Sequence, residues 1–257
     1  MKVVILAGGL GSRISEETAE KPKPMVLIGE YPILWHLIEI FRMQGCKDFV
    51  IALGYKGEII NNWLSGLFQL IESYFDKTSK SYVKVFENPP KADFRITTLD
   101  TGLETQTGGR IKKCFEFLED EHAIFTYGDG LANVNIADLL NFHLGHGGFA
   151  TVTGVRPPAR FGSIEFVNEK VIHFGEKEQA SSGWINGGFF VLERQVANFI
   201  KDYMEPFETG ALPRLVRAGQ LMCYRHEGFW KPMDTLREKH EFDQLALLNP
   251  LPWLMKY

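Results

Sequence analysis

The sequence predicts an α/β protein with a Rossmann-like, mixed but mainly parallel sheet flanked by helices. Three observations lead to this fold class. Continuous apolar runs, such as residues 3–6, are typical of strands that are buried on both faces of a sheet. Segments with the 3.6-residue period of helices lie between these runs. Glycines follow several of the runs, as they do where the carboxyl ends of parallel strands open a crevice.

The first half of the chain alternates strands and helices. The expected strands cover residues 3–6, 48–54, 82–87, 96–101 and 123–127. The expected helices cover residues 34–41, 58–70 and 110–117. Such alternation implies right-handed crossovers, which collect the carboxyl ends of the strands on one side of the sheet. Residues 73–91 are less regular, and we expect a lid, an oligomer contact or a long connection there.

The second half is richer in short elements. A strand over 149–156 precedes a hairpin whose strands, 163–167 and 170–174, flank Asn168-Glu169. The remaining expected elements are a strand over 189–192, helices over 196–203 and 212–218, a strand over 221–226 and a helix over 235–248. The sequence contains no internal repeat and no low-complexity linker. We therefore expect a single domain over residues 1–257.

The glycine-rich stretch after the first strand predicts an anion site. The strand continues into Ala7-Gly8-Gly9-Leu10-Gly11-Ser12-Arg13, and Lys21-Pro22-Lys23-Pro24-Met25 follows. Glycines let the backbone approach a ligand, so their N–H groups can form a nest for an anion. Arg13 adds a fork of donors that suits phosphate. The stretch matches neither of two known phosphate loops, since Ser12-Arg13 follows Gly11 and Ile14 replaces a third glycine.

Composition excludes some classes of partner. The formal net charge is −4 and the basic residues are dispersed, so we expect no nucleic-acid partner. No apolar run approaches the roughly 20 residues of a membrane span, so we expect no membrane partner. Cys46, Cys114 and Cys223 are widely spaced among apolar neighbours, as expected of reduced core cysteines. No signal peptide precedes the first strand, and we expect a cytoplasmic location.

The order of the motifs resembles that of the sugar-phosphate nucleotidyltransferases, also called nucleotide-sugar pyrophosphorylases. The matching stretches are residues 6–13 with Lys23-Pro24-Met25, then 107–110, 125–130, 157–162, 185–192 and 228–235. The resemblance is greatest to the cytidylyltransferase branch, which implies CTP and glucose 1-phosphate as substrates, Mg²⁺ as cofactor and a homo-oligomer. It also implies the nucleotide-diphospho-sugar transferase type of fold, with a nucleotide-binding half over 1–148 and a sugar-phosphate-binding half over 149–257.

The resemblance assigns roles to individual residues. The catalytic residues that it implies are Arg13, Lys23, Asp129 and Asp234. Arg13 would bind the phosphates that leave as pyrophosphate, Lys23 would lie near the reacting phosphorus, and Lys177 would hold the sugar phosphate. Asp129 and Asp234 would ligate Mg²⁺, which commonly takes one or two carboxylates plus substrate phosphates. Cations suit this reaction because it brings two anions together.

The resemblance also implies two sets of binding residues. The nucleotide contacts would be Leu6, Ala7, Gly8, Gly9, Gly11, Ser12, Arg13, Lys23, Thr105, Arg110 and Gly128. The sugar-phosphate contacts would be Glu176, Lys177, Asn186, Gly187, Gly188 and Trp230. Glu178 stands where the family usually has a proline, which could alter the affinity for the sugar phosphate or the choice of sugar.

Two other functions stay open at this point. One is the same chemistry with UTP, dTTP or another sugar 1-phosphate. The other is a non-catalytic regulatory protein that binds nucleotide-sugars, although such a protein has no need for both Asp129 and Asp234. Among the histidines, His143 and His146 come nearest to the spacing of a metal-binding pair, and we expect them at the exposed end of a helix.

Overall fold

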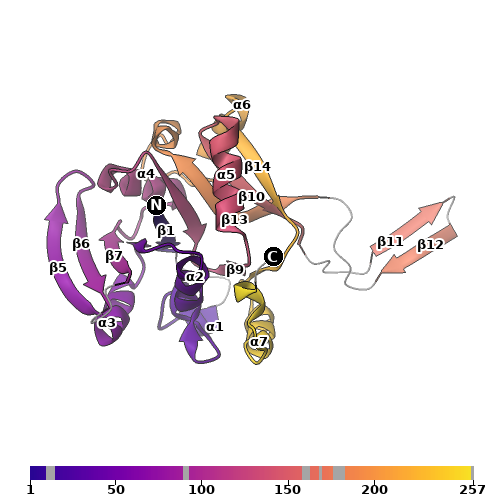
Figure 1. The fold of residues 1–257 in the computed structure, drawn as a ribbon, viewed down its shortest axis with the longest axis horizontal. Helices are drawn as coiled ribbons and strands as arrows, with labels where there is room; N and C mark the ends of the chain where they lie inside the picture. Colours follow the sequence, from indigo (N-terminus) through magenta and orange to yellow (C-terminus); the bar gives the residue numbers. More distant parts are fainter. Residues whose placement is uncertain (10–14, 89–92, 158–162, 168–169, 176–182, 256–257) are drawn as a thin grey trace.

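The computed structural model describes residues 1–9, 15–88, 93–157, 163–167, 170–175 and 183–255 (Figure 1). Among these residues, nine strands form one sheet in the order β14-β10-β13-β8-β1-β4-β7-β6-β5. The strands are β1 (Lys2–Ala7), β4 (Asp48–Leu53), β5 (Gln69–Asp76), β6 (Ser81–Glu87), β7 (Arg95–Asp100), β8 (His122–Tyr127), β10 (Ala150–Val155), β13 (Ile185–Glu193) and β14 (Leu221–His226).

The sheet is mixed and mainly parallel, as predicted. Strands β1, β4, β7 and β8 are parallel neighbours, and β10 is parallel to β14. Strand β13 runs antiparallel to both of its neighbours, and so does β6. The carboxyl ends of β1, β4, β7 and β8 therefore share one edge of the sheet, where a crevice forms in open α/β sheets.

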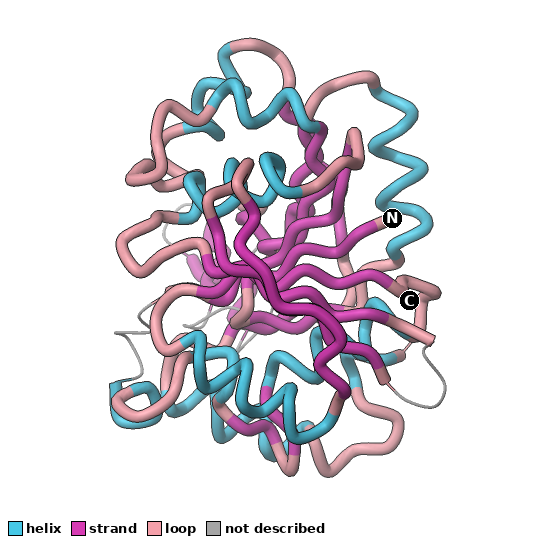
Figure 2. The backbone as a smooth tube through the Cα atoms, turned by 90° about the vertical axis from the view of Figure 1, so that its left-hand side faces the viewer, coloured by secondary structure: helices cyan, strands magenta, loops and turns pink. Residues whose placement is uncertain are grey.

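Helices cover both faces of the sheet, which lies between them in Figure 2. The α-helices are α1 (Ser15–Thr18), α2 (Ile33–Arg42), α3 (Gly57–Leu67), α4 (Thr107–Phe117), α5 (Ile136–His146), α6 (Ala211–Arg217) and α7 (Leu236–Leu245). Short 3-10 helices are η2 (Lys23–Met25), η3 (Arg194–Phe199) and η4 (Pro252–Leu254).

The helices on both faces of the sheet explain the apolar sequence of the central strand β1. Successive side chains of a strand point to opposite faces. In β1, Val3 and Ile5 pack into the core on the α2 side, whereas Val4 and Leu6 pack into the core on the α4 side. Each of these four side chains is buried, and in β1 only Lys2, its first residue, is partly exposed.

Three small two-stranded sheets complete the described structure. They pair β2 (Leu27–Ile28) with β3 (Tyr31–Pro32), β9 (Gly130–Ala132) with β15 (Trp230–Pro232), and β11 (Ser163–Val167) with β12 (Lys170–Gly175). The last pair is the predicted hairpin, and Figure 1 shows it standing away from the main sheet. The pair of β9 and β15 was not predicted, and it joins the middle of the chain to its end.

The region after α3 differs from its prediction. The helix ends at Leu67, and strand β5 follows where the end of the helix and a less regular segment were expected. Strand β5 pairs antiparallel with β6, which confirms the predicted strand over 82–87. Ile60 and Leu64 of α3 are fully buried, whereas Leu67, the last residue of the helix, is 55% exposed. The apolar period continued past the end of the helix because strand β5 begins almost at once.

Two further predictions from sequence are wrong. His143 is buried and does not lie at the exposed end of a helix. Its two ring nitrogens lie 2.8 Å from Thr151 Oγ1 and 3.1 Å from Glu193 Oε1, so both have hydrogen-bond partners despite the burial. Cys46 and Cys114 are buried as expected, but Cys223 is exposed. No helix in the described ranges is long and apolar enough to cross a membrane.

The pKa values of four histidines lead to a prediction of how the stability of the protein depends on pH. Burial lowers the pKa of His36, His143, His146 and His226 from the ordinary value of 6.5. Below pH 6.5 the unfolded chain therefore binds more protons than the folded chain, and the free energy of unfolding should fall as pH decreases. Urea titrations at pH 7.5 and 5.5 measure this change.

A pair of variants tests the contribution of His143. His143→Gln cannot bind a proton, so its stability should fall less between pH 7.5 and 5.5 than that of the wild type. His240, exposed on α7, is the matched control, and His240→Gln should keep the wild-type dependence. Equal pH dependence in all three proteins would contradict the assignment.

Candidate active site

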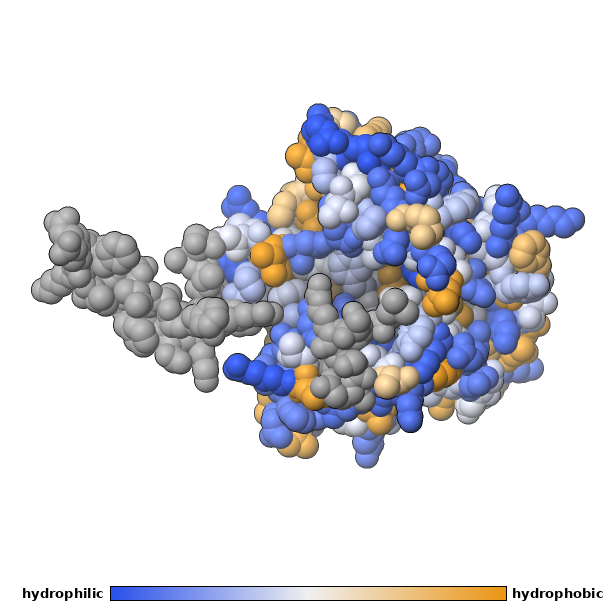
Figure 3. Space-filling model, turned by 180° about the vertical axis from the view of Figure 1, so that it is seen from behind, coloured by the Kyte–Doolittle hydropathy of each residue, from blue (hydrophilic) through white to orange (hydrophobic). Residues whose placement is uncertain are grey.

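A cleft of about 1470 Å³ opens at the carboxyl ends of β1 and β8, and residues of β9 and β15 also line it. Both halves of the chain line it. Figure 3 shows a hollow near the centre of the molecule's rear face, bordered by polar and apolar residues. Predicted site residues that line the cleft are Leu6, Ala7, Gly8, Gly9, Lys23, Thr105, Arg110, Gly128, Asp129, Asn186, Gly187, Gly188, Trp230 and Asp234.

Lys23 joins two carboxylates at one point of this cleft. Its Nζ donates to Asp129 Oδ2 at 2.7 Å and to Asp234 Oδ1 at 2.6 Å. The side chain of Lys23 is only 10% exposed, whereas those of Asp129 and Asp234 are 37% and 26% exposed. Three predicted residues from distant parts of the sequence therefore meet, and the two carboxylates converge on a single cation.

Local structure fixes each member of this cluster. Lys23 begins η2 between Pro22 and Pro24, and proline restricts the backbone on either side of it. Asp129 lies in the turn between β8 and β9. In the ladder of β9 and β15, Gly130 is opposite Pro232.

Two backbone N–H groups hold the aspartates in place, one at Met233, next to Asp234, and one at Asp234 itself. The N–H of Met233, the residue before Asp234, donates to Asp129 O at 2.8 Å. The N–H of Asp234 donates to Glu238 Oε2 at 2.7 Å. Glu238 also forms the capping box of α7 with Thr235, so the start of this helix orients Asp234.

The charges of the cluster favour a bound cation. Burial alone would lower the pKa of Lys23, but the charge of Asp129 and the hydrogen bonds to Asp129 and Asp234 outweigh burial and raise it. Lys23 therefore stays protonated, and the three groups together carry one net negative charge. Carboxylate oxygens are the ligands that Mg²⁺ prefers, and two of them here already face one cation. The donor set thus fits Mg²⁺ completed by substrate oxygens, and no group of three acidic, His or Cys ligands occurs among the described residues.

The glycines beside the cluster are required by close contacts. A Cβ on Gly128 would lie 2.9 Å from Leu6 O and 2.9 Å from Pro24 Cγ. A Cβ on Gly8 would lie 2.2 Å from Arg110 Cζ. No side chain fits at either position, so the backbone of β1 and β8 can border the cleft directly.

Arg110, which we expected to contact the nucleotide, is occupied by the protein itself. Its guanidinium donates to Leu53 O at 2.8 Å, Gly8 O at 3.0 Å, Gly102 O at 3.0 Å and Leu103 O at 3.4 Å, and also to Thr101 Oγ1. Burial lowers the pKa of Arg110 to about 10. The side chain therefore links the ends of β1, β4 and β7, and its hydrogen bond to Gly8 O holds the backbone at that glycine in place.

The sugar-side candidates are connected to one another. Trp230 Nε1 donates to Gly187 O at 2.8 Å, and the N–H of Gly188 donates to Asn186 Oδ1 at 2.8 Å. Gly188 has a φ of +81°, which a residue with a side chain rarely adopts. Thr105, on the nucleotide side, donates from its hydroxyl to Thr101 O at 2.6 Å and so stabilises the loop before α4.

Some predicted residues fall outside the described part of the chain. These are Gly11, Ser12, Arg13, Glu176, Lys177 and Glu178. Other cleft residues were missed by sequence reasoning. Thr107, Tyr127 and Glu208 line the cleft, and Glu208 lies in a loop before α6 that carries no recognisable motif.

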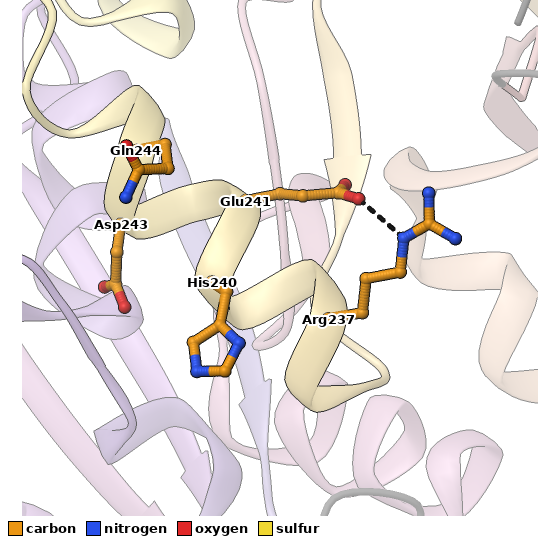
Figure 4. Close-up of a pocket in the computed structure, with 5 residues that line it drawn as sticks. All are labelled: Arg237, His240, Glu241, Asp243 and Gln244. Atoms are coloured by element: carbon orange, nitrogen blue, oxygen red, sulfur yellow. Dashed lines mark hydrogen bonds and ion pairs between the residues drawn. The ribbon is translucent and has the colours of Figure 1, made fainter.

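A second hollow, of about 380 Å³, lies on α7 and is lined by Arg237, His240, Glu241, Asp243 and Gln244 (Figure 4). Arg237 Nε donates to Glu241 Oε1 at 2.9 Å, an i,i+4 pair of the helix surface. The remaining side chains point away from this pair and from one another. The hollow therefore offers no convergent set of ligand groups.

The arrangement around Arg110 predicts a loss of stability on substitution. Arg110→Lys cannot donate to all the carbonyls that the guanidinium now binds, so the free energy of unfolding should fall by about 2–4 kcal/mol, as expected when buried acceptors lose their partners. Urea denaturation measures the change, with Arg217→Lys on the exposed side of α6 as the control. Unchanged stability with weaker nucleotide binding would instead favour direct contact with the ligand.

Comparison with known proteins identifies the family of the chain. A family model described as nucleotidyl transferase matches residues 2–238. The chain is 42% identical to a glucose-1-phosphate cytidylyltransferase of Salmonella typhi over 254 residues, which is 98% of each chain. It is 40% identical to a probable glucose-1-phosphate cytidylyltransferase of Bacillus subtilis over 246 residues, covering 95% of this chain and 96% of the relative.

Solved structures share the fold. HddC from Yersinia pseudotuberculosis superposes with a TM-score of 0.70 at 22% identity, covering 95% of this chain and 98% of that one. A putative glucose-1-phosphate thymidylyltransferase from Bacillus anthracis superposes with a TM-score of 0.67 at 20% identity, covering 97% and 96%. These structures confirm the predicted fold class, and the family model and the sequence identities confirm the family: the chain belongs to the nucleotidyl transferases.

Proposed function

We propose that the protein transfers the cytidylyl group of CTP to α-D-glucose 1-phosphate, giving CDP-glucose and pyrophosphate. One observation carries this proposal: Lys23, Asp129 and Asp234 meet in a large cleft that both halves of the chain line. The identity of 42% over 98% of the chain to the Salmonella typhi cytidylyltransferase supports the choice of substrates.

The reaction needs charge control more than an activated protein nucleophile. An oxygen of the sugar phosphate is already ionised, and it attacks the α-phosphorus of CTP in line as the bond to the departing pyrophosphate breaks. Two like charges at about 4 Å repel by roughly 4 kcal/mol at an effective dielectric of 20. The protein must therefore surround the two substrates with cations.

The residues of the cluster supply this control. Asp129 and Asp234 would hold Mg²⁺, which when bound would neutralise phosphate charge and orient the reacting groups. Lys23, protonated and buried at the same point, would offset negative charge near the α-phosphorus. Gly8, Gly9 and Gly128 would let the nucleotide approach the backbone, and Arg110 would keep this backbone in place.

The remaining roles follow from the resemblance in sequence. Arg13 would bind the departing pyrophosphate, and Lys177 with Glu176 would hold the sugar phosphate. Residues 1–148 would contribute chiefly to the nucleotide and residues 149–257 chiefly to the sugar phosphate. One continuous sheet includes strands from both halves, so the two sets of side chains would face each other across the cleft.

We also propose that the protein works in the cytoplasm, where nucleoside triphosphates are made, and that it is a homo-oligomer. Strand β5 is a candidate contact between copies, because this sheet-edge strand exposes Leu70, Ile71, Tyr74 and Phe75. Sedimentation velocity tests the oligomer, and a single monomeric species at micromolar concentration would exclude it.

Pyrophosphate release tests the proposed reaction. Glucose 1-phosphate with Mg²⁺ should support release with CTP in clear preference to UTP, dTTP and ATP, and EDTA should abolish it. Preference for another nucleotide would overturn the proposed product, and no release with any of the four would overturn the proposed function.

Substitution of the aspartates tests the role of the cluster. Asp129→Asn and Asp234→Asn should each lower kcat by about a hundredfold or more, because a metal contributes several kcal/mol and each 1.4 kcal/mol is about tenfold in rate. Both variants should stay folded, since both side chains border the cleft. Asp202→Asn, in an exposed loop, is the matched control. Full activity of Asp234→Asn would contradict the assignment.

A further inference from the structure

A line of hydrogen bonds in the cleft joins residues that do not belong to the Lys23 cluster. It runs from Thr107, the first residue of α4, through Glu208 and Tyr127 to Asn186 on β13. Thr107 Oγ1 donates to Glu208 Oε2 at 2.7 Å, and the hydroxyl of Tyr127 donates to Glu208 Oε1. Asn186 Nδ2 donates to the Tyr127 hydroxyl oxygen at 3.3 Å. All four residues line the cleft.

The chemistry of a carboxylate sets the direction of these hydrogen bonds. Ionised Glu208 can only accept, so Tyr127 must give its single hydroxyl hydrogen to Glu208. The Tyr127 oxygen is then an acceptor for Asn186, which must turn its NH₂ group toward it. At the other end, Asn186 Oδ1 accepts from the N–H of Gly188 at 2.8 Å. Both ends of the Asn186 amide are thereby oriented.

Packing keeps Tyr127 in place. Its ring contacts Phe190 edge-on at 5.6 Å between centroids. Gly188 packs so closely against the ring that an added Cβ would lie 2.7 Å from Tyr127 Cδ2. The tyrosine therefore has little freedom to turn away from Glu208.

Glu208 is itself anchored from both sides. The preceding residue, Phe207, is fully buried, and its ring lies 5.6 Å from that of Phe190. The N–H of Phe207 donates to Thr107 Oγ1 at 2.8 Å. A carboxylate that is exposed to the cleft is thus held by the backbone next to it and by two hydroxyl donors.

We propose that Glu208 is a positioning residue for the sugar, because through Tyr127 it fixes the direction in which the Asn186 amide faces the cleft. Each amide nitrogen carries two N–H groups, and the one that does not bind Tyr127 would donate to a sugar hydroxyl. Strand β8 separates β13, which carries Asn186, from β1 and its glycines. The negative charge of Glu208 also favours uncharged hydroxyls over phosphate at this side of the cleft. This inference rests on the proposed function.

Steady-state kinetics of two single variants test the inference first. Glu208→Gln introduces a donor that can reverse the direction of the hydrogen bonds, and Tyr127→Phe removes the hydroxyl that links Glu208 to Asn186. Each should raise KM for glucose 1-phosphate by about tenfold, the effect of losing one oriented hydrogen bond. KM for CTP should stay within about twofold of the wild type, given the same principle.

The double variant separates positioning from independent effects. Because both substitutions act through the same path to Asn186, the KM for glucose 1-phosphate of Glu208→Gln/Tyr127→Phe should be no higher than that of the single variants. Glu227→Gln, in the exposed turn after β14, is the matched control and should behave as the wild type. Thermal melting checks that each variant is folded, and Tyr127→Phe carries the test if Glu208→Gln is unfolded.

Each remaining outcome is decisive. Equal rises of KM for both substrates, multiplied effects in the double variant, or an unchanged KM for glucose 1-phosphate would overturn the inference while leaving the proposed function intact. A wild-type protein that releases no pyrophosphate from CTP and glucose 1-phosphate would instead overturn the proposed function.

Discussion

The structure of the site depends on one constraint, which is that two carboxylates from distant parts of the chain must face the same cation. Asp129 and Asp234 both bind Lys23 Nζ, within 2.7 Å. Unpaired carboxylates this close would repel each other, so the surrounding structure must hold them in place. The ladder of β9 and β15, the hydrogen bond from Met233 to Asp129, and the capping box of α7 provide this support.

The sheet brings the substrates to this point. The strand order places β1 between β4 and β8, so the glycines after β1 and Asp129 after β8 lie at the same edge. Arg110 holds this edge by binding the carbonyls of Gly8, Leu53 and Gly102. A residue that the resemblance assigns to ligand binding thus has a second role, which is to fix the backbone that the ligand meets.

Much of the fold could be predicted from the sequence because buried strands have a strong local signal. Residues 3–7 of β1 are all apolar, since both faces of the sheet are covered there. The edge strand β5 was missed because it exposes apolar and polar residues alike and continues the period of α3. The burial of His143 on α5 was not predicted, because its partners, Thr151 of β10 and Glu193 of β13, lie in distant parts of the sequence. Motifs indicated Lys23, Asp129 and Asp234, whereas Glu208 depends on a tertiary contact that no local pattern encodes.

Metal binding is the most direct test of whether Asp129 and Asp234 hold the cation, because it requires no turnover. Mn²⁺, a spectroscopic substitute for Mg²⁺, can be titrated by electron paramagnetic resonance into the protein with CTP present and glucose 1-phosphate absent. We expect Asp129→Asn and Asp234→Asn each to weaken Mn²⁺ binding by about tenfold or more, the usual scale for altering a metal site. Wild-type affinity in both variants would show that the two carboxylates do not hold the metal.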